Sequence, residues 1–246
     1  MKSSTRVAKG KIVVESSTQL APDDFPLGDW IPGRRRIPSQ ERSLRTRRQI
    51  LNAAEALAKS EGVGNITMQM IASKAKIAAG TAYQFFDDRD AIFAEIYEEW
   101  ARTWWPTLMK ATAHPLDESN WREGLQDLTA KMGKFYLDAS SRWDIVTYIH
   151  STKEGRSAVR DLLEGNINRF VLWIGPLFRA RGYSAAETRA ICSLLVRTIR
   201  GHWVYGVNTP AEMRELARAA ADGARAIVEV KLTRASRPRP VNGKNA

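Results

Sequence analysis

The feature that most constrains this 246-residue chain is a helical period that runs, with short interruptions, from about residue 41 to about residue 232. The interruptions fall at helical spacing, at Gly62-Val63-Gly64, His114-Pro115, Ser140-Ser141, Gly182 and Asn208-Thr209-Pro210. No segment shows the alternation of apolar and polar residues that is typical of a strand. We therefore expect an all-α fold of about nine helices.

The two ends lack this period. Residues 1–40 contain four prolines, and the segment from residue 233 onward is basic and similarly biased in composition. Such composition is typical of disorder because too little apolar surface is available for burial. We expect a disordered arm over residues 1–40 and a basic disordered tail over residues 233–246.

The excess of positive charge lies in two segments of the chain. Residues 34–93 carry 11 Lys and Arg against 6 Asp and Glu, and residues 231–246 carry 5 against none, whereas the long middle is nearly neutral. This distribution indicates a module that binds a polyanion, joined to a neutral body. A surface that merely keeps the chain in solution gives the same pattern.

Two short helices follow a longer one near the amino-terminal end of the helical part. The long helix spans about residues 44–60, the next begins at Thr67, whose hydroxyl can cap it, and the last spans about residues 79–85 after a turn. This order is typical of a helix-turn-helix, in which the last helix enters the major groove. A small three-helix packing unit is the alternative.

The same segment combines several features over about 45 residues: Ile50-Leu51, Ala53-Ala54, Gly62, Thr67, Ile71-Ala72, Ala75, Gly80-Thr81, Tyr83, Phe85-Phe86, Arg89-Asp90 and Ile92. Together they resemble the DNA-binding domain of the tetracycline-repressor (TetR) family. The resemblance implies an amino-terminal helix-turn-helix domain over residues 41–90. It also implies a helical ligand-binding and dimerisation domain over residues 91–232.

The resemblance also implies roles for single residues. Thr67, Tyr83 and Arg89 match positions that contact phosphates, which set the register of the protein on DNA. The groove-facing positions match Ala79, Gly80, Thr81 and Gln84. We add two cations as DNA contacts, Arg47 and Lys76. Tyr83 as a core residue and Gln84 as a solvated side chain are the alternatives.

The chain departs from the family pattern at three positions. Lys76 stands where the turn normally has glycine, at some backbone cost if its φ is positive. Ala78 stands where a serine normally caps the recognition helix, and Ala82 replaces a bulky apolar residue before the tyrosine.

The body is rich in aromatic residues, and three interpretations compete for them: core, a cavity for an apolar or aromatic small molecule, and a dimer interface. The expected pocket residues are Trp104, Met132, Tyr136, Trp143, Tyr148, Phe170 and Trp173. Pro106 is expected to kink or end the helix that joins the DNA-binding domain to the body.

By their order and length, the last two helices resemble the family's dimer interface. The residues expected there form apolar or small-residue stripes: Ile191, Leu195, Thr198, Leu216, Ala220, Ala224 and Ile227. Core within a single chain is the alternative for these residues.

Enzyme chemistry finds no support in the sequence. The three histidines are far apart without metal-ligand spacing, and no nucleophile elbow or phosphate-binding loop occurs. We expect no catalytic residues, no metal site and no cofactor. A single cysteine, together with no secretory leader and no membrane-length apolar run, favours a reducing, cytoplasmic compartment.

These observations predict a transcriptional regulator, by default a repressor. It would bind a pseudo-palindromic operator in double-stranded DNA as a homodimer and respond to a small-molecule effector. The alternative is a DNA-binding adaptor or architectural factor that a protein partner controls without a small ligand.

Overall fold

A computed structural model describes residues 40–138, 142–204 and 210–235 of the chain. Within these ranges the fold contains ten α-helices, one short 3-10 helix and no strand, which confirms the all-α prediction. The expected arm lies outside the described residues, apart from residue 40. Most of the expected tail lies outside them too, although the last helix extends to Ala235.

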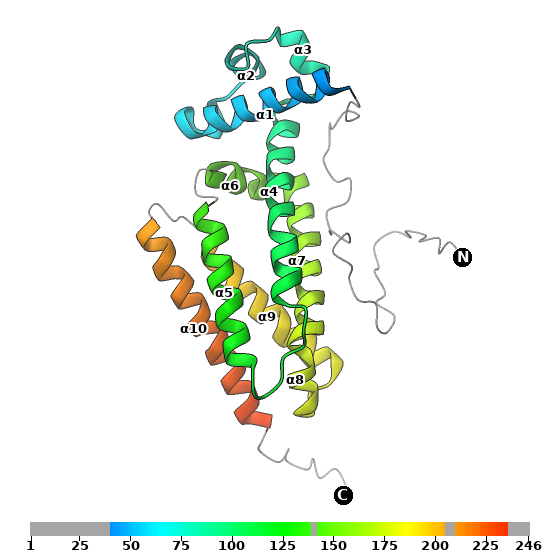
Figure 1. The fold of residues 1–246 in the computed structure, drawn as a ribbon, viewed down its shortest axis with the longest axis vertical. Helices are drawn as coiled ribbons and strands as arrows, with labels where there is room; N and C mark the ends of the chain where they lie inside the picture. The colour runs from blue at the N-terminus through cyan, green and yellow to red at the C-terminus, as the bar shows by residue number, and fades with distance from the viewer. Residues whose placement is uncertain (1–39, 139–141, 205–209, 236–246) are drawn as a thin grey trace, which may run out of the picture.

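The amino-terminal helices form a head at one end of the molecule (Figure 1). They are α1 (Glu41–Glu61), the 3-10 helix η1 (Val63–Asn65), α2 (Met68–Lys74) and α3 (Ala79–Tyr83). One face of α1, including Ile50, Ala54 and Ala58, is buried, and α1 packs against both α2 and α4. The spacing of these apolar residues is the helical period read from the sequence.

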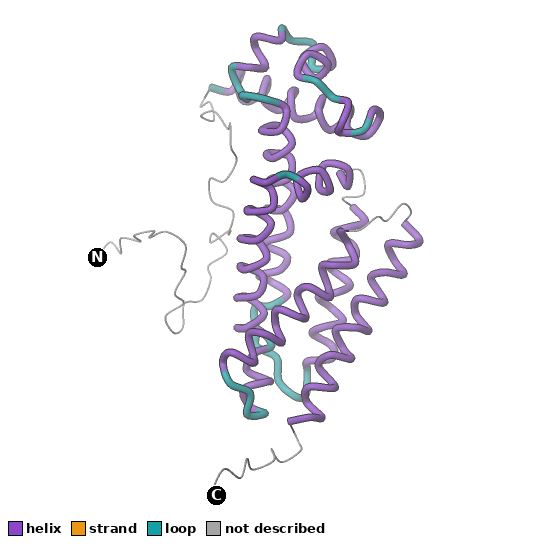
Figure 2. The backbone as a smooth tube through the Cα atoms, turned by 180° about the vertical axis from the view of Figure 1, so that it is seen from behind, coloured by secondary structure: helices purple, strands orange, loops and turns teal. Residues whose placement is uncertain are grey.

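Helix α4 (Arg89–Ala111) runs from the head into the body, as both views of the chain show (Figures 1 and 2). Asp88 caps it by accepting a hydrogen bond from the Ala91 backbone N–H at 2.8 Å. The helix does not end at Pro106, which is exposed and lies within it. Because α4 packs against α1 and also against helices that follow it in the chain, it connects the head with the body.

The body consists of the remaining six helices, which Figure 1 shows below the head. They are α5 (Trp121–Asp138), α6 (Trp143–Ser151), α7 (Lys153–Trp173), α8 (Gly175–Ala180), α9 (Ala185–Val204) and α10 (Pro210–Ala235). The helical pattern of the sequence has no interruption over residues 156–181, which predicts one helix there, but the structure has two, α7 and α8. Pro176 explains the break, because proline lacks an N–H and disfavours helical backbone at the residue before it.

Candidate DNA-binding surface and body cavity

Helix α2 is fixed by a side-chain cap at its start and by burial of its inner face. The Thr67 hydroxyl accepts a hydrogen bond from the Met70 backbone N–H at 3.2 Å, as a capping threonine does. Met68, Ile71 and Ala72 are buried on the other side. Thr67 itself is exposed, so it lies at the surface next to the turn and α3.

The turn between α2 and α3 is built on Lys76 in the left-handed region. Lys76 has φ 57°, and it is the only described non-glycine residue with positive φ. Its N–H donates to the Ser73 carbonyl at 3.0 Å, and the Ile77 N–H donates to the Ala72 carbonyl at 3.0 Å. A lysine therefore takes the strained turn, as the sequence anticipated, at a cost of roughly 1 kcal/mol. Its side chain is exposed.

Helix α3 has one buried and one free face. Ala82 and Phe86 are both 0 % exposed and hold the helix to the head. On the other face Tyr83 is 43 % exposed, and Gly80 and Gln84 are exposed as well. A Cβ placed on Gly80 would meet nothing within 4 Å, so the backbone is open to a close approach there. Ala79 and Thr81 are half-buried.

Arg47 lies in the interior and not on the DNA-facing surface, which corrects the expectation that it contacts DNA. Its guanidinium forms a bidentate ion pair with Glu95 on α4, with Nε at 2.8 Å from Oε1. It also donates to the Phe85 carbonyl at 3.3 Å and lies 4.4 Å from the centroid of the Phe86 ring. Arg47 thus joins α1, α4 and the end of the recognition helix.

Arg89 is engaged mainly with the backbone of the head. Its Nη1 donates to the carbonyls of Val63, Gly64 and Ile66 at 3.3, 3.0 and 2.5 Å. These three bonds hold the segment that leads into α2. The guanidinium of Arg89 therefore positions this part of the head, in addition to any contact that it makes with a phosphate.

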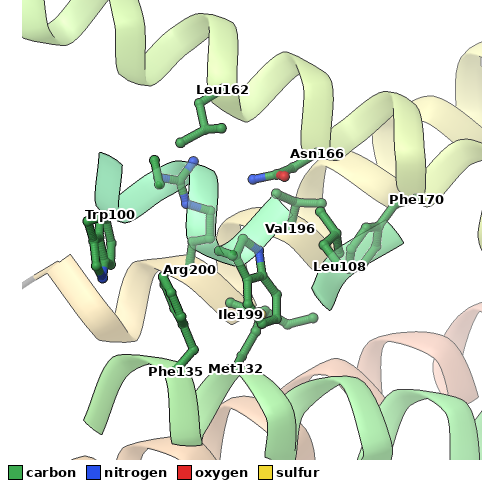
Figure 3. A pocket seen from close by; sticks show the side chains of 12 residues that line it. Trp100, Leu108, Met132, Phe135, Leu162, Asn166, Phe170, Val196, Ile199 and Arg200 are labelled. Atoms are coloured by element: carbon green, nitrogen blue, oxygen red, sulfur yellow. The ribbon is translucent and has the colours of Figure 1, made fainter. Parts of the chain in front are cut away.

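Helix α4 and three helices of the body line a small cavity of about 30 Å³ (Figure 3). This is space for one or two water molecules and well below the roughly 300 Å³ typical of ligand pockets, so a larger occupant requires the lining to open. The lining residues are Trp100, Ala101, Trp104 and Leu108 of α4, Met132 and Phe135 of α5, Leu162, Asn166 and Phe170 of α7, and Val196, Ile199 and Arg200 of α9.

Three of the expected pocket residues line this cavity: Trp104, Met132 and Phe170. Three others lie elsewhere. Trp143 packs edge-on against Trp100 with ring centroids 6.3 Å apart, and the Tyr148 hydroxyl donates to Asp90 at 2.7 Å near the head. Trp173 is buried near Leu116, whose N–H donates to the Trp173 carbonyl at 2.7 Å. The side chain of Tyr136 is outside the described part of the structure.

The sequence did not single out Trp100, Phe135, Asn166 or Arg200 as pocket residues. The sequence did contain a signal for Trp100, because Trp100, Trp104 and Leu108 recur every four residues on α4. Asn166 has a similar signal, because it recurs with Leu162 and Phe170 at the same spacing on α7. A single asparagine on an apolar stripe marks a place where a polar group is buried. Nothing comparable pointed to Arg200.

His150 of α6 lies beside the aromatic cluster at the head-side end of the body. Its Nε2 is 3.3 Å from the Tyr97 hydroxyl, and the two rings meet edge-to-face. Burial, together with the smaller effect of the charge on Arg200, lowers the pKa of His150 from 6.5 to about 4. His150 is therefore neutral at physiological pH.

The helices expected to form the dimer surface bury most of the predicted residues inside the chain. Ile191, Leu195, Ala220 and Ala224 are at most 5 % exposed, because α9 packs on α7 and α8 and α10 packs on α5 and α9. This corrects the expectation that these four face a partner. The other three residues, Thr198, Leu216 and Ile227, are half-buried.

No described helix combines the length and apolar character needed to cross a membrane. Within the described ranges, no three or more His, Cys, Asp or Glu side chains gather so as to hold a metal ion.

Helices α1 to α3 thus form a helix-turn-helix with one exposed face, carried on a helical body. Residues 50–96 match the family model of bacterial regulatory proteins of the tetR family. An uncharacterised HTH-type transcriptional regulator of Mycobacterium tuberculosis is 30 % identical over 66 residues, which is 27 % of this chain and 31 % of that protein. The chain thus matches less than a third of the length of this curated relative.

The fold is similar to solved structures over about three quarters of the chain. A TetR-family transcriptional regulator of Mesorhizobium loti superimposes with a TM-score of 0.54 and 21 % identity, over 76 % of this chain and 98 % of that one. A SmeT–triclosan complex gives a TM-score of 0.53 and 20 % identity, over 74 % and 90 %. The tetR-family match thus covers residues 50–96, and the similarity to these solved structures shows a shared fold.

Proposed function

We propose that the chain is a transcriptional regulator that reads duplex DNA with the free face of α3. The observation that carries this proposal is the division of α3 into two faces. Ala82 and Phe86 anchor it, while Gly80, Tyr83 and Gln84 face outward. Gln84 can hydrogen-bond a base edge, and an open backbone at Gly80 permits contact with the groove floor.

Contacts with phosphates would fix the position of α3 on the duplex. The hydroxyls of Thr67 and Tyr83 lie at the exposed side of the head, and Lys76 adds a cation at the turn between them. Such contacts supply affinity without sequence information. Substitution of Lys76 would therefore weaken binding to all sequences alike and reduce its salt dependence.

The test is DNA binding by a double variant with altered base and phosphate contacts. A preferred sequence is first selected from random duplex DNA, and its affinity is then measured by fluorescence anisotropy. Tyr83→Phe with Gln84→Ala should weaken binding to this sequence at least tenfold. Gln126→Ala, an exposed change on α5, serves as the matched control and should have no effect. Equal affinity for the wild type and the double variant would refute the proposal.

We further propose that the regulator acts as a homodimer on a pseudo-palindromic operator, with repression as its effect. In the described part of the body, the exposed large apolar side chains are Leu194 on α9 and Val230 on α10. Their placement supports an interface on the outer faces of these helices, supplemented by the half-buried Thr198, Leu216 and Ile227. Leu194→Arg should convert a dimer into a monomer in light scattering, whereas Leu44→Arg on the head should not.

The cavity supports a small-molecule effector, whose binding would shift the balance between conformers of different DNA affinity. Its small volume favours a second candidate, a DNA-binding factor controlled by a protein partner. A compound that binds the body and changes the affinity for DNA would favour control by a small-molecule effector over control by a protein partner.

A further inference from the structure

The cavity of the body has an apolar wall with two polar groups in it, Asn166 and Arg200, from neighbouring helices. Asn166 projects from α7 and is 6 % exposed, and Arg200 projects from α9. Figure 3 shows both side chains among the apolar residues that surround the cavity. Polar groups at such places usually fix the orientation of a ligand.

The first of these groups is a hydrogen-bond acceptor without a donor. The Oδ1 atom of Asn166 is buried and accepts no hydrogen bond within the described residues. Leaving a buried acceptor unsatisfied is unfavourable, so native structures nearly always pair such an atom. A ligand that carries an O–H or N–H would supply the missing donor.

The second group is a cation without a counterion. Within the described ranges Arg200 forms no ion pair or hydrogen bond with a side chain, whereas Arg47 and Arg189 each pair with a glutamate. Arg200 is close enough to His150 for its charge to lower the pKa of that histidine, and His150 is not an acid. A partly buried guanidinium in apolar surroundings attracts an anion, and its planar fork matches a carboxylate.

The apolar wall suits a compact hydrophobic body. Trp100 and Phe135 stack with ring centroids 5.1 Å apart and an interplanar angle of 22°, and Trp104 lies 5.2 Å from Phe135. These rings come from α4 and α5. Helices α7 and α9 add Leu162, Phe170, Val196 and Ile199, so Asn166 and Arg200 are two polar groups in a lining that is otherwise mostly apolar.

We propose that this cavity, once its lining opens to admit a larger occupant, binds a small hydroxylated carboxylic acid with an aromatic or branched aliphatic body. The carboxylate accepts hydrogen bonds from Arg200, the hydroxyl donates to Asn166 Oδ1, and the body packs against Trp104 and Phe135. This inference rests on the proposed effector site and names the class of effector.

The test compares three probes on the wild-type chain by isothermal titration calorimetry at pH 7: mandelate, its neutral amide mandelamide, and phenylacetate, which lacks the hydroxyl. We expect mandelate to bind about tenfold more tightly than mandelamide, because a charge-assisted hydrogen bond is lost in the amide. We expect phenylacetate to bind several-fold more weakly than mandelate.

Two variants test whether Arg200 sets the preference for the acid and Asn166 the preference for the hydroxyl. Arg200→Met should abolish the preference for the acid over the amide, and Asn166→Leu should abolish only the preference for the hydroxyl. Arg197→Met, an exposed arginine on the same helix, is the matched control and should keep both preferences. The wild-type comparison needs no variant, so a variant that does not fold leaves the proposal testable.

Equal affinity for mandelate and mandelamide, or no binding of any probe at millimolar concentration, would overturn the inference. If the same preparation still binds its selected DNA through Tyr83 and Gln84, the proposed DNA-binding function stands without it. If the amide binds as well as the acid, an effector site remains but its charge selectivity does not.

Discussion

Breaking the buried ion pair between Arg47 and Glu95 should be among the most damaging single changes in the head. Both side chains are at most 5 % exposed, and the pair connects α1 with α4. In Glu95→Gln the guanidinium keeps its charge but loses its counterion in the interior. Removing one partner of a buried pair costs about 3–5 kcal/mol, which corresponds to a fall in melting temperature of roughly 10 °C for a chain of this size.

The structure offers a matched control one residue away. Arg48 and Glu99 join the same two helices, with hydrogen bonds of 2.7 and 2.8 Å, but their side chains are 57 % and 40 % exposed. Water screens such a pair, so Glu99→Gln should cost less than about 1 kcal/mol. Equilibrium unfolding in urea, followed by tryptophan fluorescence, measures both costs.

A double change gives a further check on the physical reasoning. Arg47→Met combined with Glu95→Leu removes both charges and replaces them with apolar groups, so much of the lost stability should return. The interpretation of the pair as a buried electrostatic link would be refuted if Glu95→Gln cost no more than Glu99→Gln. It would also be refuted if the double variant lost as much free energy of unfolding as the sum of the losses in Arg47→Met alone and Glu95→Leu alone.

Three shorter predictions follow from the backbone and from titratable groups. Lys76→Gly should raise the free energy of unfolding by about 1 kcal/mol, because glycine tolerates positive φ, and an unchanged melting temperature would contradict this. The folded-state pKa of His150 is about 4, below its usual 6.5, so stability is fully present above pH 6.5 and declines as the pH falls towards 4. The decline should reach up to about 3 kcal/mol in urea titrations, and His150→Phe should flatten it. Burial raises the pKa of the Cys192 thiol to about 12, so Ellman's reagent at pH 8 should label it only after unfolding, and rapid labelling of the native chain would be the contrary result.

The head was predictable from sequence because its determinants are local. The cap at Thr67, the apolar spacing of α1 and the aromatic anchor at Phe86 all act within a few turns of helix, and the structure uses each of them. Arg47 shows the limit of this reasoning. A basic run on a helix predicts solvent exposure, but the acid that draws one arginine inward, Glu95, is 48 residues away.

The body was less predictable because an apolar stripe does not specify what covers it. The stripe through Ile191 and Leu195 fits a partner subunit as well as it fits α7, and only the tertiary arrangement decides between them. The same holds for the aromatic residues. Trp104 lines the cavity and Trp173 does not, although both lie on helices with similar periodicity.

The brevity of α3 has a consequence for how the protein recognises its target. The helix has five residues, and Ala78 provides no side-chain cap at its start. A helix this short is unstable in isolation. The exposed face of α3 is therefore ordered only because the helix packs on the residues beneath it. Contact with a duplex would add the missing partners for its first N–H groups. Association would thus be accompanied by local tightening, visible as slower amide hydrogen exchange over residues 78–84 in the complex than in the free protein.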